Sequence, residues 1–156
     1  MADVRTVRAE LDDLEALVPL FDGYRRFYRQ PADPQGARAF LAERITRNES
    51  VIFLAMRDRA AVGFTQLYPL FSSVSLKRLW VLNDLFVAPE ARRSGAGRAL
   101  LARAERWARE TGAKGLTLST EVTNLTARRA YETAGWTKDE EFVHYHHYHR
   151  FFDATD

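Results

Sequence analysis

Residues 87–101 read Val-Ala-Pro-Glu-Ala-Arg-Arg-Ser-Gly-Ala-Gly-Arg-Ala-Leu-Leu, and this stretch decides the fold of the chain. It predicts the end of a strand, a short turn, an Arg-x-x-Gly-x-Gly loop and then an amphipathic helix. Glycine has no Cβ, so the backbone of such a loop can come close to a ligand. The N–H groups of a first helical turn have no intrahelical partner, and the helix dipole adds partial positive charge there. The stretch therefore predicts a binding site for a diphosphate, flanked by Arg92, Arg93 and Arg98.

The spacing of this loop excludes the two most common nucleotide-binding loops. A Walker loop needs a Lys-Ser or Lys-Thr pair after its last glycine, and none follows Gly97. A dinucleotide fingerprint needs a third glycine three residues after Gly97, where the chain has Leu100. A Gly-x-Gly pair by itself fits equally well a helix-start turn whose arginines are solvated.

The composition favours one globular domain over residues 1–156. Of the 156 residues, 46% are hydrophobic and 12% aromatic, which is enough to fill a core. The formal net charge of +2 is small for a nucleic-acid-binding protein. The chain has no cysteine, which excludes disulfides, thiolate metal sites and a cysteine nucleophile. No apolar run reaches membrane-spanning length and none resembles a signal peptide, so we expect a cytoplasmic protein with no nucleic-acid or membrane partner.

Hydrophobic periodicity predicts strands and helices in mixed order. Strands are expected at 4–9, 51–57, 61–70, 77–87, 116–120 and 142–152. Helices are expected at 11–29, with a break near Pro19 and Gly23, and at 34–48, 95–111 and 124–134. This order indicates a mixed α/β (α+β) domain.

Three motifs together resemble the GNAT superfamily of acyl-CoA-dependent N-acyltransferases. They are the Arg-x-x-Gly-x-Gly loop, the preceding strand Leu-Asn-Asp-Leu-Phe-Val at 82–87, and the later motif Asn124-x-x-Ala127-x-x-x-Tyr131-x-x-x-Gly135-Trp136. The resemblance implies a GNAT-type fold, in which a central, mostly antiparallel, splayed sheet of six to seven strands is flanked by about four helices. It also implies acetyl-CoA as the cosubstrate and no metal.

The resemblance assigns the cofactor site to three segments. Backbone N–H groups of the glycine loop would hold the CoA diphosphate, and backbone groups at the strand end would pair with the pantetheine arm. Asn124 and Ala127 would line the other side of the cofactor, and Tyr131 would face the thioester sulfur. The loop and strand residues are Leu85, Phe86, Val87, Arg92, Arg93, Ser94, Gly95, Ala96, Gly97 and Arg98.

Amine acylation needs a base, and it is aided by an acid. A free lysine-type amine, with a pKa of about 10.4, must lose a proton before it attacks an acyl carbon, and a nearby carboxylate can remove it. Asp84 is the candidate base, and the alternative is a structural pairing with an arginine. Tyr131 is the candidate acid for the CoA thiolate, and the alternative is a core aromatic. Without a cysteine, direct attack in a ternary complex is expected instead of a cysteinyl intermediate.

Within the superfamily the chain looks most like the small diamine (spermidine/spermine) acetyltransferases and the small fungal histone/polyamine group. Those relatives usually carry Glu-Asp where this chain has Asn83-Asp84, and Asn83 cannot act as a base. Either Asp84 or a water chain takes that role, or the amine arrives neutral. The acceptor site is expected to be walled by Asp84 with Tyr24, Phe27 and Tyr28. Nearby arginines favour a small amine, an amino acid or a carboxylate-bearing acceptor over a long polyamine.

The histidine-rich end, 142–152, is expected to form an aromatic strand instead of a metal site. In a strand only two of its imidazoles share each face, which is fewer than a structural zinc site uses. Its composition makes it a candidate contact of a homodimer. The expected function is acetyl transfer to a primary amine of a small molecule. The alternatives are a non-catalytic CoA-binding or regulatory module and a protein or peptide lysine N-acetyltransferase.

Overall fold

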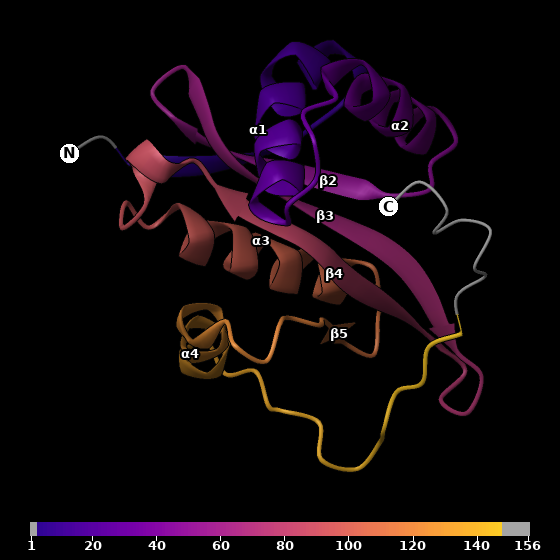
Figure 1. Cartoon of the computed structure of the whole chain (residues 1–156). Coiled ribbons are helices and arrows are strands. Elements are labelled where there is room, and N and C mark those ends of the chain that lie inside the picture. The colour runs from indigo at the N-terminus through magenta and orange to yellow at the C-terminus, as the bar shows by residue number, and fades with distance from the viewer. Residues whose placement is uncertain (1–2, 148–156) are drawn as a thin grey trace. The chain divides into compact units, whose positions relative to one another are not determined.

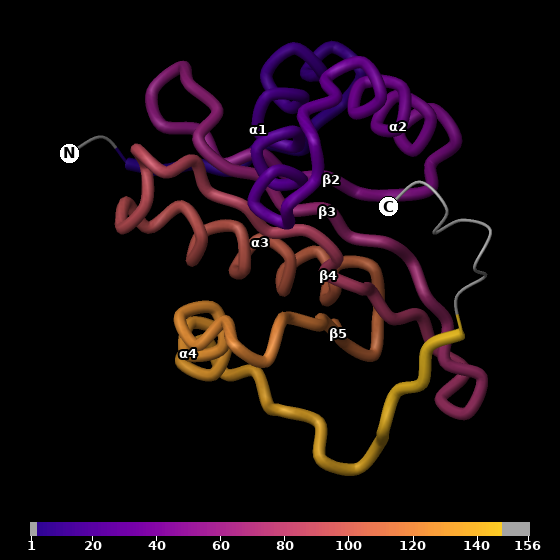
Figure 2. Tube along the Cα trace, in the orientation of Figure 1, coloured from indigo at the N-terminus to yellow at the C-terminus, as the bar shows by residue number. Residues whose placement is uncertain are grey.

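The described part of the chain is built around one five-stranded sheet. The computed structural model describes residues 3–147, whose path is drawn as ribbons in Figure 1 and as a trace in Figure 2. The chain divides into two compact units, Met1–Ser119 and Thr120–Asp156, and all five strands belong to the first. The expectation of one domain over residues 1–156 stays a prediction.

The strands follow one another across the sheet in sequence order. Pairing is antiparallel from β1 to β4 and parallel between β4 and β5, and the parallel pair is connected through α3. The strands are β1 (Val4–Arg8), β2 (Val51–Arg57), β3 (Ala60–Ser72), β4 (Lys77–Val87) and β5 (Leu116–Thr117). The helical elements of the first unit are η1 (Leu11–Asp13), α1 (Leu14–Phe27), α2 (Pro34–Thr46), η2 (Pro89–Ala91) and α3 (Ala96–Glu110). The predicted mixed α/β fold with a mostly antiparallel sheet is confirmed.

Helices cover both faces of this sheet (Figure 1). On the face of α1 and α2, Ile52, Leu54 and Phe64 lie in one buried cluster with side chains of both helices. On the face of α3, Phe53 contacts Trp107 with ring centroids 5.9 Å apart. The central strands are therefore buried on both sides, which explains their nearly continuous apolar sequences.

Helix α1 runs without interruption through Pro19, so the predicted break near Pro19 and Gly23 is wrong. The apolar face of the helix, which includes Phe21, is buried against the sheet, and that burial outweighs the hydrogen bond that proline cannot donate. Gly23 allows the helix to lie close to β4, since a Cβ at this position would meet Phe86 Cζ at 3.2 Å.

A β-bulge interrupts β4. Gln66 of β3 pairs with Asp84 and Leu67 pairs with Leu82, which leaves Asn83 as an extra residue in β4. A bulge of this kind changes the face to which the following side chains point.

The side-chain directions on either side of the bulge agree with this change. Before it, Trp80 contacts Trp107 of α3, with ring centroids 5.9 Å apart. After it, Phe86 packs against the cluster beneath α1. In a regular strand these two positions would share one face, because side chains alternate with a period of two. The bulge therefore directs Asp84 toward the α1 face.

The second unit contains helix α4 (Leu125–Thr133), which begins and ends close to the predicted positions. Asn124 caps it by accepting a hydrogen bond from Ala127 N at 3.2 Å. Gly135 follows the helix with a φ of 94°, a conformation that suits glycine.

Two predicted strands differ from the structure. The strand expected at 116–120 is limited to Leu116–Thr117, and residues 142–147 form no strand, while 148–152 lie outside the described residues. The part of the chain that the structure describes thus has five strands instead of six to seven. A strand needs a neighbour for its backbone hydrogen bonds, and alternation of side chains does not supply one. Within residues 3–147, no helix is both long and apolar enough to cross a membrane.

Candidate active site

Asp84 is the centre of a buried polar cluster between β3, β4 and α1. The Asp84 residue is only 3% exposed to solvent. Gln66 Nε2 donates to Asp84 Oδ2 at 2.5 Å, and Asn83 Nδ2 donates to Asp84 Oδ1 at 2.8 Å. The Thr65 hydroxyl donates to the backbone oxygen of Asp84 at 2.8 Å, and the Tyr24 hydroxyl donates to that of Asn83 at 3.2 Å. Among the described residues, Asp84 has no ion-pair partner. The alternative that Asp84 pairs with an arginine is therefore not observed.

Burial raises the pKa of the Asp84 carboxyl above its ordinary value. Hydrogen bonds from Gln66, Asn83 and Tyr24, in that order, oppose this rise because they favour the charged form. Tyr68, half-buried on the same face, has a raised pKa because of burial and then because of the Asp84 charge. A carboxyl with a raised pKa can take up a proton at a higher pH than an exposed one, as a general base for an amine requires.

The aromatic residues predicted to wall the acceptor site form a chain of ring contacts along α1. Tyr24 contacts both Phe86 and Tyr28, with ring centroids 6.4 and 5.1 Å apart. Tyr28 in turn contacts Phe27 at 5.3 Å, and Phe27 is 51% exposed. The structure therefore brings Tyr24 to the Asp84 cluster and places Phe27 and Tyr28 farther along the same helix end.

The glycine loop forms the predicted turn at the start of α3. Arg93 and Gly95 have positive φ values of 65° and 89°, and the helix begins at Ala96. The helical hydrogen bonds begin with Ala99 N, which donates to Gly95 O at 3.0 Å, so the amides of the first turn point out of the helix end. Arg92 Nε donates to Val87 O at 3.4 Å, which ties the loop to the end of β4.

Two observations in this loop fit a phosphate group. Ser94 Oγ is buried and has no hydrogen-bond partner within residues 3–147. A Cβ at Gly95 would meet no atom within 4 Å, and one at Gly97 would meet only Val87 Cγ2 at 3.8 Å. An orphaned hydroxyl and two glycines without close neighbours, next to the amides of a first helical turn, are compatible with an anion site at a helix N-terminus.

The remaining predicted cofactor residues belong to the second unit. Asn124 is the N-cap of α4, and its side chain accepts a hydrogen bond from Ala127 N. Tyr131 contacts Trp136, with ring centroids 6.0 Å apart. The cofactor and acid roles of Asn124, Ala127 and Tyr131 stay predictions.

Three residues around Asp84 were not among the predicted site residues, namely Thr65, Gln66 and Tyr68. All three lie in the apolar strand 60–72, where Thr65 and Gln66 form a polar pair between Phe64 and Leu67. A polar pair in the middle of an apolar strand is visible in the sequence. The residue that this pair contacts depends on strand pairing, which the sequence pattern does not specify.

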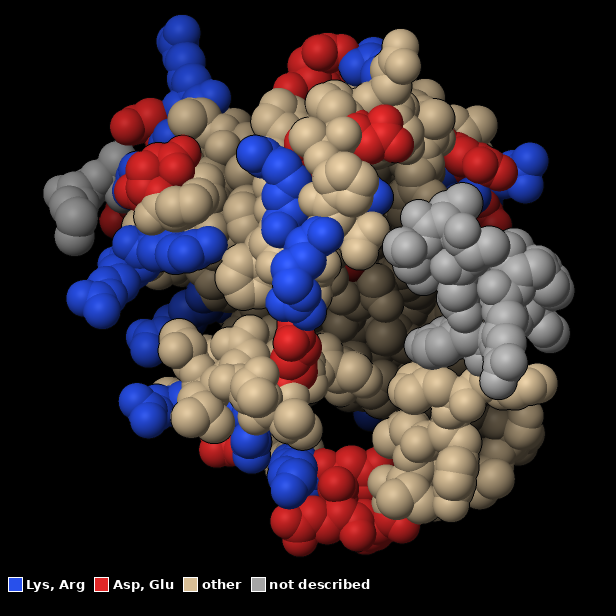
Figure 3. All heavy atoms as spheres, in the orientation of Figure 1, with Lys and Arg blue, Asp and Glu red and all other residues tan. Residues whose placement is uncertain are grey.

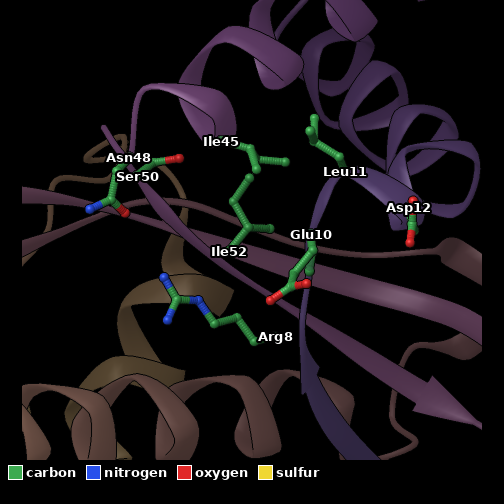
Figure 4. Close-up of a pocket in the computed structure, with 9 residues that line it drawn as sticks. Arg8, Glu10, Leu11, Asp12, Ile45, Asn48, Ser50 and Ile52 are labelled. Atoms are coloured by element: carbon green, nitrogen blue, oxygen red, sulfur yellow. The ribbon is translucent and has the colours of Figure 1, made fainter.

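A separate cavity of about 380 Å³ lies at the junction of β1, η1, α2 and β2. Figure 4 shows Arg8, Glu10, Asn48 and Ser50 around Ile45 and Ile52. None of the predicted site residues lines it. It is distinct from both the Asp84 cluster and the glycine loop.

The glycine loop and the start of α3 carry three basic side chains, Arg92, Arg93 and Arg98. Figure 3 shows acidic and basic side chains on the face that it draws, with a group of acidic side chains at its lower edge. Among the described residues, no group of three or more His, Asp or Glu side chains could hold a metal ion. The expectation that neither a metal nor a nucleic acid takes part stays a prediction.

The sequence profile of the acetyltransferase (GNAT) family matches residues 17–136, which include most of α1, the Asp84 cluster, the glycine loop and α4. The chain therefore belongs to the GNAT acetyltransferase family.

The similar proteins include two bacterial N-acetyltransferases and one solved structure. The chain is 54% identical to the uncharacterized N-acetyltransferase YhfO of Bacillus subtilis (strain 168), over 88% of this chain and 93% of YhfO. It is 33% identical to an aminoglycoside N(6')-acetyltransferase type 1 of Klebsiella aerogenes, over 64% of this chain and 66% of that protein. The crystal structure of a probable acetyltransferase superposes with a TM-score of 0.87 at 48% identity, over 91% of this chain and 95% of the other.

The relatives confirm the predicted superfamily, and the GNAT-type fold with it. They do not support the predicted placement in the diamine or fungal histone/polyamine branch, because their names refer to aminoglycosides or to no substrate at all. The aromatic helix and the strand at 82–87, which suggested that branch, are short motifs and distinguish branches poorly.

Proposed function

We propose that this protein transfers an acetyl group from acetyl-CoA to a primary amine of a small molecule, by direct attack in a ternary complex. The observation that carries the proposal is the buried Asp84 carboxylate, held at a bulge in the strand that leads into the glycine loop. Acetyl-CoA supplies an activated acyl group when it is bound. The unpartnered Ser94 Oγ and the open space at Gly97 support binding of its diphosphate at the loop.

Each residue of the proposed site has a defined task. Asp84 takes the proton from the acceptor amine, and Asn83, which cannot be a base, orients the carboxylate through its hydrogen bond. The first-turn amides of α3 hold the diphosphate, and the backbone at 85–87 pairs with the pantetheine arm. Tyr131 donates a proton to the leaving thiolate.

We propose a small amine, an amino acid or an amino sugar as the acceptor, in preference to a long polyamine. Arg25 and Arg26 lie at the end of α1 beside Phe27 and Tyr28, and two positive side chains there disfavour a polycation. The likeness to an aminoglycoside N(6')-acetyltransferase makes amino sugars the first class to test. A cytoplasmic location and a homodimer formed through 142–152 belong to this proposal and rest on the sequence alone.

The proposal is tested by CoA release from acetyl-CoA with a thiol reagent. The acceptors are aminoglycosides, spermidine, putrescine, free amino acids and a histone peptide. Because the protein has no cysteine, it adds no background to the thiol signal. Turnover with one small-molecule class is expected. Turnover with the peptide alone would identify a lysine acetyltransferase, and acetyl-CoA binding without any turnover would favour a non-catalytic CoA-binding module.

Replacing Tyr131 by phenylalanine is expected to lower kcat by about 10²- to 10⁴-fold, because the leaving thiolate loses its proton donor. The Kd for acetyl-CoA should change little, since the ring is retained. Stopped-flow turnover and calorimetric titration measure the two quantities. Tyr145→Phe, an exposed position of the same unit, serves as the matched control. An unchanged kcat in the Tyr131 variant would remove this residue from the acid role.

A further inference from the structure

A buried glutamine lies directly across the strand pair from the proposed base. Gln66 is 0% exposed, pairs with Asp84 in register and donates to Asp84 Oδ2 at 2.5 Å. Phe64 and Leu67, close to it in β3, are also fully buried. A polar side chain therefore occupies a core position that packing alone would fill with leucine or methionine.

One side of this amide lacks a partner. Gln66 Oε1 is buried and accepts no hydrogen bond from any residue in the range 3–147. A buried oxygen without a partner loses its hydration and gains nothing in return, which lowers the stability of the folded state. Any favourable interaction of the Gln66 side chain therefore comes from its NH2 group.

The NH2 group orients the Asp84 carboxylate. Oδ2 accepts from Gln66, and Oδ1 accepts from Asn83. Asn83 is exposed at the bulge, whereas Gln66 is enclosed in the sheet, so Gln66 is the more rigid of the two donors. With one donor on each oxygen, the carboxylate cannot rotate without losing a hydrogen bond, and each oxygen keeps a further lone pair.

We propose that Gln66 is a positioning residue for acetyl transfer: its NH2 group holds the Asp84 carboxylate in one orientation and in its charged form, ready to accept the amine proton. This inference rests on the proposed function of Asp84. In the proton transfer, an N–H bond of the acceptor ammonium breaks and an O–H bond forms on Asp84. The electron pair stays on the nitrogen, which then attacks the acyl carbon.

The electrostatic surroundings indicate how the loss of this hydrogen bond would show itself. Burial raises the pKa of Asp84, and the hydrogen bond from Gln66 is the first of those that lower it. The other titratable or charged groups near this carboxyl are Tyr24 of α1 and Tyr68 of β3, and Arg44 of α2 acts on Tyr68. Without the amide, the pKa of Asp84 rises, and the acidic limb of the pH profile of kcat/KM moves to higher pH.

The test is Gln66→Met, which keeps the volume and removes the amide. We expect kcat to fall about tenfold or more and the acidic limb to move to higher pH, while the Kd for acetyl-CoA stays the same. The matched control is Gln35→Met, at an exposed position of α2, which should change none of these quantities. A purely structural role for Gln66 would lower the melting temperature and leave the pH profile in place.

A second variant, Gln66→Glu, keeps the shape and covers the case in which Gln66→Met does not fold. Its carboxylate next to Asp84 should raise the pKa of the pair, so the acidic limb should move even further upward. An unmoved limb in both variants would overturn the positioning role. Asp84→Asn tests the proposed function separately. Full activity in that variant would contradict the proposed role of Asp84. Loss of activity in that variant, with no effect of the Gln66 substitutions, would contradict only the role of Gln66.

Discussion

Replacing Asp84 by asparagine is expected to lower kcat/KM by about 10²- to 10⁴-fold, the range typical for loss of a general base. The amide keeps the shape of the side chain but cannot take the proton of the acceptor amine. Because the pKa of Asp84 is raised by burial, the acidic limb of the wild-type pH profile should also disappear in the variant. Initial rates across a pH series measure both effects.

The same substitution is expected to increase stability at neutral pH. A carboxyl whose folded-state pKa lies above its unfolded value retains its proton longer in the folded state, so its contribution to stability falls as the pH rises from the unfolded value of about 4 through the folded value. The asparagine side chain of the variant does not titrate, so this fall is absent from it. The melting temperature of the variant relative to wild type should therefore increase with pH, as thermal unfolding at several pH values would show.

Asp22 provides a matched control for Asp84. It is a second buried aspartate, 5% exposed, but it accepts from Asp33 N at 2.8 Å and lies 3.4 Å from Arg26 Nε. Asp22→Asn should lower stability slightly and leave the acidic limb of the pH profile of kcat/KM in place. If Asp84→Asn kept its activity, Asp84 would be a structural residue and the base would have to be water.

Replacing Gly97 by tryptophan is expected to raise the Kd for acetyl-CoA by about 100-fold or more, which corresponds to a loss of about 2.7 kcal/mol of binding free energy. A Cβ at this position meets no atom closer than Val87 Cγ2 at 3.8 Å, so the helix can form around the substitution. The indole would then occupy the space in front of the α3 N-terminus, where the diphosphate is proposed to bind. Calorimetric titration with acetyl-CoA measures the effect.

Gly115→Trp is the control for this substitution. A Cβ at Gly115 also has no atom within 4 Å, but the residue lies in the connection before β5 and not in the glycine loop. Its affinity for acetyl-CoA should equal that of the wild type, and both variants should melt near the wild-type temperature. Normal affinity in the Gly97 variant would mean that the diphosphate binds elsewhere.

Much of the Asp84 cluster lies outside what sequence patterns can predict. Asp84 was identified because a carboxylate before a glycine loop is a local feature of the chain. Thr65 and Gln66 were missed because they contact Asp84 across the β3–β4 pair, in a register that the bulge at Asn83 determines. The bulge also reverses which side chains of β4 face α1, and a strict alternation pattern predicts the opposite.

What the sequence by itself determined is the set of features that depend on neighbours along the chain. The glycine loop, the start of α3, the Asn124 cap and the positions of most strands follow from turn chemistry and periodicity, which act over a few residues. Tertiary structure alone decided the continuity of α1 through Pro19, the burial of Asp84 and its partnership with Gln66. Each of these depends on contacts between segments far apart in sequence, where the free energy of burial outweighs local preference.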